Sequence, residues 1–165
     1  VDAIKHHAED GGKVLGICNG FQVLCEMGLL PGALARNNNQ RFSCKDVYLK
    51  VESTISALTC GLQGGEVLRI PIAHAEGRYV ISNSALQELH DNNQIVVRYC
   101  NADGQINHDS NPNGSMDDIA GVSNKQGNVV GLMPHPERAA DNILGNDDGK
   151  VLLECLSKSL DVMHA

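Results

Sequence analysis

Aromatic side chains and long apolar runs are scarce in this sequence. Only 3% of the 165 residues are aromatic and none is tryptophan, so the core must be built from Val, Ile, Leu, Ala and Met. No apolar run approaches the roughly 20 residues that a membrane-spanning helix needs, and no signal peptide is visible. We therefore expect a cytoplasmic protein that does not act at a membrane.

Basic residues are also few. The chain has 13 Lys and Arg against 20 Asp and Glu, for a net charge of -7. Binding to a phosphate backbone needs a surface rich in Lys and Arg, so a nucleic-acid partner is not expected. The length fits one domain, and the 42% of hydrophobic residues is ordinary for a globular protein.

The six cysteines include no CxxC pair, which argues against a structural zinc site. A chain of this length does not need disulfides to fold, so free thiols are expected. One of these thiols is then a candidate nucleophile.

Strands that alternate with helices predict an α/β fold. Predicted loops cover 36–44 and 101–118, and an unstructured loop as long as the second is usually functional or disordered. Predicted helices cover 2–10, 21–27, 84–90 and 148–163, and predicted strands cover 13–17, 46–52, 66–73 and 94–99, with a hairpin formed by 119–123 and 128–133.

The strongest local pattern is a Gly-x-Cys-x-Gly turn, residues 16–20, that joins a short apolar strand to a helix. This is the nucleophile-elbow pattern, with cysteine in place of serine. The glycines permit a tight turn, and the start of the helix favours a thiolate at Cys18. The backbone N–H of Asn19 is then placed to stabilise an oxyanion. The alternative is a buried structural cysteine, which is common.

A possible base follows the apolar strand 129–132. His135 and Glu137 are two residues apart in a proline-containing segment, where extended backbone would point both side chains to the same side. A carboxylate beside an imidazole fixes its tautomer and stabilises its charged form, as a base for a thiol requires. Because functional residues gather at the C-terminal ends of strands, we expect Cys18, His135 and Glu137 to form a triad.

Other interpretations of these residues remain. Taken alone, His135 fits a satisfied histidine in a proline-rich turn equally well. A metal site around it is disfavoured, because no HExxH or similar spacing supplies three convergent ligands. Gln22 lies four residues after Cys18 and shares its helical face, although a core-facing or solvent-facing glutamine is the alternative.

Taken together, the tracts at 16–22 and 133–138 closely resemble the triad-type, class I glutamine amidotransferases. More narrowly, the sequence resembles the glutaminase subunits of phosphoribosylformylglycinamidine synthase, which serve purine biosynthesis. The resemblance covers essentially the whole chain. The narrower resemblance rests on four tracts: 71–79, 111–115, 118–122 and 128–139.

The resemblance implies both a fold and a mechanism. The implied fold is flavodoxin-like, with a mixed, mostly parallel sheet flanked by helices. Cys18 would attack the side-chain amide of L-glutamine, His135 would pass the thiol proton to the departing ammonia, and Glu137 would orient His135. A glutamyl thioester would then be hydrolysed to glutamate. Asn19 and Gln22 would bind the substrate.

The resemblance also implies a partner. Ammonia would pass to a separate ATP-dependent synthetase subunit that makes formylglycinamidine ribonucleotide. No P-loop occurs in this chain, so no cofactor is expected on it, while ATP and Mg²⁺ are expected on the partner.

One feature departs from the family pattern. Family members carry an N-terminal strand and a Gly-Gly loop before the nucleophile strand, and that loop supplies the other half of the oxyanion hole. Here Gly11-Gly12 is only the turn before the strand. We therefore expect residues 1–165 to form a single, N-terminally truncated amidotransferase domain. Its activity alone should be low, since one lost oxyanion donor costs ~10²–10³ in rate.

Three rival functions remain open: a triad amidotransferase of pyrimidine, GMP or histidine synthesis, a cysteine peptidase or other hydrolase, and an inactive partner subunit. The tracts 71–79 and 111–115 argue against the first, and Gln22 argues against the second. Selective alkylation of Cys18 would argue against the third. The roles of His74, Arg78, the asparagines 37–39 and the 101–118 loop stay open between substrate, partner and structure.

Overall fold

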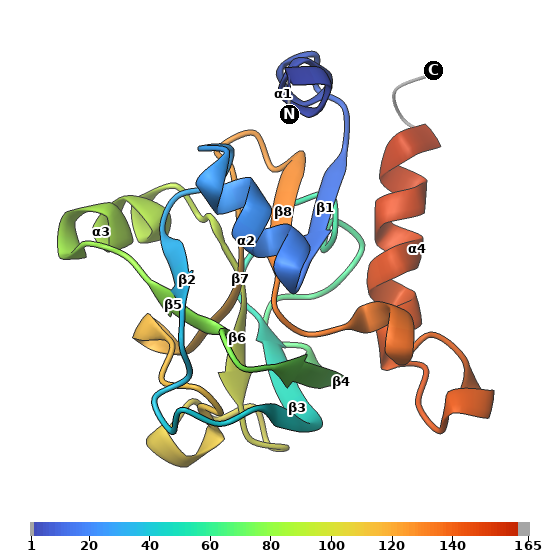
Figure 1. The fold of residues 1–165 in the computed structure, drawn as a ribbon. Coiled ribbons are helices and arrows are strands. Elements are labelled where there is room, and N and C mark those ends of the chain that lie inside the picture. Colours follow the sequence, from blue (N-terminus) through green and yellow to red (C-terminus); the bar gives the residue numbers. More distant parts are fainter. Residues whose placement is uncertain (1, 162–165) are drawn as a thin grey trace.

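The structure is a computed structural model that describes residues 2–161. Six strands form one mixed sheet, and a two-stranded sheet lies beside it (Figure 1). In spatial order the larger sheet is β1 (Val14–Ile17), β8 (Val129–Leu132), β7 (Ile119–Ser123), β6 (Ile95–Cys100), β3 (Ser43–Val51) and β4 (Val67–His74); the smaller pairs β2 (Ala33–Ala35) with β5 (Arg78–Val80).

Residues 2–161 contain four α-helices. Helix α2 packs on β1 and β8, whereas α4 packs on β4 and on the short turn that follows β8 (Figure 1). The α-helices are α1 (Asp2–Glu9), α2 (Asn19–Glu26), α3 (Asn83–Asp91) and α4 (Asp148–Asp161), and the 3₁₀ turns are η1 (His108–Ser110), η2 (Met116–Asp118), η3 (Pro136–Arg138) and η4 (Asn142–Leu144).

The α/β class and the mixed sheet are confirmed, but the expectation of a mostly parallel sheet is wrong. Only β1 and β8 run parallel, and the other four pairings in the large sheet are antiparallel. Short connections such as 124–128 allow only antiparallel neighbours, because a parallel pair needs a longer crossover. The β7–β8 hairpin was itself predicted, and its register sets Gly121 opposite Leu132.

Most predicted elements exist, with ends displaced by a few residues. Strands β2 and β5 were missed because three residues are too short for an alternating pattern to register. The loop predicted at 36–44 ends earlier, since β3 begins at Ser43. In the C-terminal helix, Leu152 and Cys155 are buried as expected, but Leu160 is exposed; the predicted end at 163 lies outside the described residues.

Within the described residues, two apolar clusters form the core. One includes Leu152 of α4 and residues of five strands of the large sheet, and the other includes Phe21 and Leu24 of α2. Phe21 stacks on Tyr79 with ring centroids 5.7 Å apart, which ties α2 to β5. The close fit of α2 on β8 requires Gly131, where an added Cβ would lie 2.0 Å from the ring of Phe21.

The parallel pairing of β1 and β8 positions the two motifs found in the sequence. Ile17 is level with Leu132, so the chain leaves both strands at the same end, the C-terminal end of this parallel pair. Cys18 follows the first strand and the 133–138 tract follows the second. Of the helices between residues 2 and 161, none has the length and apolar character needed to cross a membrane.

Candidate active site

Cys18 sits on a strained turn between β1 and α2. Its backbone has φ 52° and ψ −107°, a conformation that is costly for a residue with a side chain. Its N–H donates to the carbonyl of Leu132 at 2.7 Å. Gly16 is needed here, because an added Cβ would lie 2.7 Å from the backbone of Gly20. The local geometry is therefore that of the predicted elbow.

The Cys18 thiol is half-buried and contacts strand β4, at the opposite end of the sheet order from β1. Its Sγ donates to the carbonyl of Ala73 at 3.8 Å, within reach for sulfur. Burial raises the pKa of the thiol, while the N–H of Asn19 and the charge of Arg138 oppose that effect and the charge of Glu137 adds to it. The expected preference for a thiolate is therefore only partly met, and the thiol needs a base.

His135 lies at the edge of this site with only 8% of its surface exposed. Its backbone N–H donates to the carbonyl of Pro71 at 2.8 Å, and its Nδ1 lies 2.6 Å from Oε1 of Glu137. A carboxylate can only accept, so Nδ1 donates to it, and in the neutral ring Nε2 is the nitrogen with the free lone pair. Nε2 is buried and has no hydrogen-bond partner within residues 2–161.

The backbone around this pair is not extended, contrary to the prediction. Pro136 opens the short 3₁₀ turn η3, which contains Glu137 and Arg138. A proline at the first position of a turn is favourable, because its fixed φ suits the turn and it has no N–H to satisfy. The turn brings the carboxylate back onto the imidazole of His135 by a different route from the predicted one.

The η3 turn also delivers charge to the thiol. The charge of Arg138 lowers the pKa of Cys18 and that of Glu137 raises it. The thiol and the His135 N–H contact the carbonyls of Ala73 and Pro71, two residues apart on β4. Nε of Arg138 is 3.7 Å from the same Glu137 oxygen that His135 contacts. The structure thus brings Cys18, His135 and Glu137 to the same end of the sheet, where β1 and β8 end.

The two predicted substrate-binding residues differ in placement. The side chain of Asn19 is exposed, while its backbone N–H lowers the pKa of the Cys18 thiol against the larger, raising effect of burial, as a donor close to Sγ would. Gln22 is half-buried, and its amide donates to Glu26 at 3.0 Å along the same helix. Only Asn19 therefore presents a group to the thiol in this conformation.

A buried polar network next to the site was not predicted. Asn37, His74, Asn113 and Ser115 are all buried, although their residue types usually lie at the surface. Burial lowers the pKa of His74 to about 4. A hydrogen bond to its own backbone raises this pKa by a smaller amount, and the charge of His135 lowers it slightly further. The asparagine-rich composition at 37–39 and 111–113 was the available signal, but composition does not distinguish buried asparagines from exposed ones.

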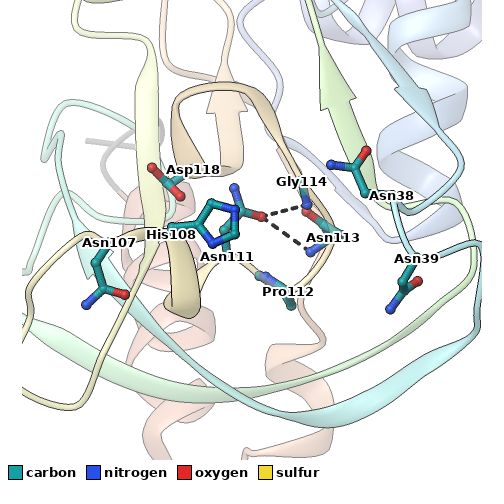
Figure 2. A pocket seen from close by; sticks show the side chains of 9 residues that line it. All are labelled: Asn38, Asn39, Asn107, His108, Asn111, Pro112, Asn113, Gly114 and Asp118. Carbon is teal, nitrogen blue, oxygen red and sulfur yellow. Dashed lines mark hydrogen bonds between the residues drawn. The ribbon is translucent and has the colours of Figure 1, made fainter.

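The 37–39 and 101–118 loops meet around a separate hollow. This cavity, of about 670 Å³, lies between the loops, and Figure 2 shows Asn111 accepting hydrogen bonds from the N–H groups of Asn113 and Gly114. None of the triad residues lines it. In the part of the chain that the structure describes, no three His, Cys, Asp or Glu side chains are placed to hold a metal ion.

Known proteins match this chain closely. The family of the CobB/CobQ-like glutamine amidotransferase domain matches residues 1–151. The phosphoribosylformylglycinamidine synthase subunit PurQ of Salinibacter ruber is 51% identical over 98% of this chain and 69% of its own length. The PurQ subunit of Aquifex aeolicus is 55% identical over 91% of this chain and 66% of its own length.

Solved structures agree. The structure of PurLQS from Thermotoga maritima matches with a TM-score of 0.80 and 43% identity, over 95% of this chain and 66% of that one. A glutamine amidotransferase from the same organism matches with a TM-score of 0.53 and 16% identity, over 99% of this chain and 54% of that one, and supports the fold alone. The chain spans about two thirds of the length of the curated relatives it matches.

Proposed function

We propose, since the chain belongs to the family of CobB/CobQ-like glutamine amidotransferases and within it to the PurQ subunits, that it is the glutaminase of a phosphoribosylformylglycinamidine synthase. It hydrolyses L-glutamine to glutamate and ammonia in the cytoplasm. The ammonia serves an ATP-dependent synthetase subunit that makes formylglycinamidine ribonucleotide in purine biosynthesis.

One observation carries the chemical part of this proposal. His135 and Glu137 are hydrogen-bonded at 2.6 Å, and Nε2 of His135 is buried with no partner among residues 2–161, while Cys18 occupies a strained turn. A buried basic nitrogen without a partner is costly unless a ligand or reacting group engages it. Burial raises the pKa of the Cys18 thiol, so the thiol needs such a base to become a thiolate.

The reaction then proceeds in two halves. His135 takes the proton from the thiol of Cys18, and Sγ bonds to the side-chain carbonyl carbon of glutamine. The N–H of Asn19 stabilises the resulting oxyanion. The C–N bond breaks as His135 returns the proton to the nitrogen, which leaves as ammonia. Water, deprotonated by His135, next attacks the glutamyl thioester, and glutamate leaves as the thiol is reprotonated.

Replacing Cys18 with alanine tests this function. In the subunit assembled with its synthetase, Cys18→Ala should abolish glutamine-dependent synthesis and leave ammonia-dependent synthesis intact. Cys44→Ala is the matched control, because Cys44 is an exposed free thiol. Retained glutamine-dependent activity would exclude Cys18 as the nucleophile, and loss of both activities would exclude the role in ammonia supply.

A further inference from the structure

Gly77 is held from both sides by buried asparagines. Its N–H donates to Oδ1 of Asn37 at 3.0 Å, and its carbonyl accepts from Nδ2 of Asn113 at 2.8 Å. Gly77 also has no room for a side chain, since a Cβ would lie 2.3 Å from the imidazole of His74. Both backbone groups and the Cα of this residue are therefore restrained.

The hydrogen-bond partners fix how each amide is oriented. Nδ2 of Asn37 donates to the carbonyls of Arg41 at 2.9 Å and His74 at 3.0 Å, so the remaining atom, which accepts from Gly77, must be the oxygen. The same oxygen lies 3.2 Å from Nδ1 of His74, which therefore carries the proton of that ring. This side chain is fully used, with two donors and one shared acceptor.

Asn113 is equally committed. Its Oδ1 accepts from the N–H of Ser115 at 3.0 Å and from its hydroxyl at 2.7 Å. Its Nδ2 donates to Tyr99 Oη at 3.3 Å as well as to Gly77. The Ser115 hydroxyl also lies 3.3 Å from the Gly77 carbonyl, so Asn113 is the nearer of two donors to it. Buried hydrogen bonds of this kind restrain the groups that they join.

The turn held in this way, residues 74–77, continues strand β4 where β4 contacts the candidate triad. The carbonyl of Ala73 accepts from the thiol of Cys18, and the carbonyl of Pro71 accepts from the N–H of His135. The charge of Cys18 also adds to the large effect of burial in raising the pKa of Tyr99. Asn37, Gly77 and Asn113, here called the clamp, are thus linked to the thiol through β4.

We propose that Asn37 and Asn113 are positioning residues that hold the 74–77 turn, and through it the end of β4 that contacts the thiol, and so shape the glutamine site. The inference rests on the glutaminase function proposed above. Neither asparagine contacts a reacting atom, and both act through the turn. Their loss is therefore expected to weaken glutamine binding more than it slows the chemical step.

The first test replaces Asn37 with aspartate in the subunit assembled with its synthetase. Asn37→Asp keeps the oxygen that accepts from Gly77. It replaces the amide nitrogen, which donates to the carbonyls of His74 and Arg41, with an oxygen that those carbonyls repel. We expect KM for glutamine to rise at least about tenfold, while kcat changes by less than about threefold. Ammonia-dependent synthesis should not change. Asn39→Asp is the matched control, because Asn39 is exposed and uses only its oxygen.

An independent variant, Asn113→Asp, protects the test against a fold defect at one position. It removes the donor to Gly77 and keeps the acceptor for Ser115, so the same rise in KM is expected. Asn107→Asp is its control, since Asn107 is exposed and uses Oδ1 and backbone groups only. Melting temperatures of all four variants report the folded state.

The outcomes separate the two proposals. A wild-type complex without glutaminase activity would overturn the proposed function. An active wild type, with both clamp variants folded and KM unchanged, would overturn the clamp alone. A fall in kcat as large as the rise in KM would show that the asparagines serve only the fold, and so would failure of both variants to fold. Either result would also overturn the clamp.

Discussion

Exchanging Glu137 for glutamine isolates the contribution of its negative charge to the proposed base. The carboxylate accepts from His135 at 2.6 Å, and a hydrogen bond to a charged group contributes roughly 1.5–3 kcal/mol. The Glu137 side chain is 45% exposed, so solvent screening places the effect near the lower end, about 1.5–2 kcal/mol. At tenfold per ~1.4 kcal/mol, kcat for glutamine hydrolysis should fall roughly 10–30-fold.

The same substitution should affect thiol reactivity in the opposite direction. The charge of Glu137 adds to burial in raising the pKa of Cys18, so its removal favours the thiolate. Alkylation of Cys18 by iodoacetamide at fixed pH should therefore become faster while glutamine turnover becomes slower. Peptide mass spectrometry separates this thiol from the other five.

Glu154→Gln is the control for that experiment. Glu154 lies on α4 with a half-exposed side chain, and its carboxylate lies 3.9 Å from Nζ of Lys150. It should change neither rate. A fall in kcat of less than about threefold in Glu137→Gln, or slower alkylation of Cys18, would refute the assignment of Glu137 as the partner of the base.

Two further predictions concern stability. Gly131→Ala forces a Cβ against Phe21 and should cost about 1–3 kcal/mol, which lowers the melting temperature by roughly 2–12 °C. Gly64→Ala, with open space around it, is the control, and an unchanged melting temperature in Gly131→Ala would contradict the packing. Because burial holds the pKa of His74 near 4, the folded protein keeps this ring neutral while the unfolded chain protonates it below about pH 6.5. Stability should therefore be fully present above pH 6.5 and decline toward pH 4 by on the order of 3 kcal/mol. His74→Asn should flatten this decline in urea unfolding at pH 7 and pH 5, and an equally steep decline in the variant would contradict the assignment.

Much of the fold and the likeness to the amidotransferases could be read from short stretches of sequence. The elbow at Cys18 depends on two glycines and a strand–helix junction, all within a few residues. The β7–β8 hairpin depends on a short polar turn between two apolar runs. Such features are decided by local conformational preference, so a window of about ten residues contains the required information. The catalytic roles remain a prediction that the experiments above address.

The tertiary structure alone decided how these pieces meet. Four of the five pairings in the large sheet are antiparallel, and the thiol after β1 contacts β4, the strand at the other end of the sheet order. The sequence contains Asn37 and Asn113 in two ordinary polar loops, and only the fold buries them on either side of Gly77. Local preference determines which residues turn, pair or coil. Which distant group satisfies a buried amide depends on where the whole chain places it, and no short pattern encodes that.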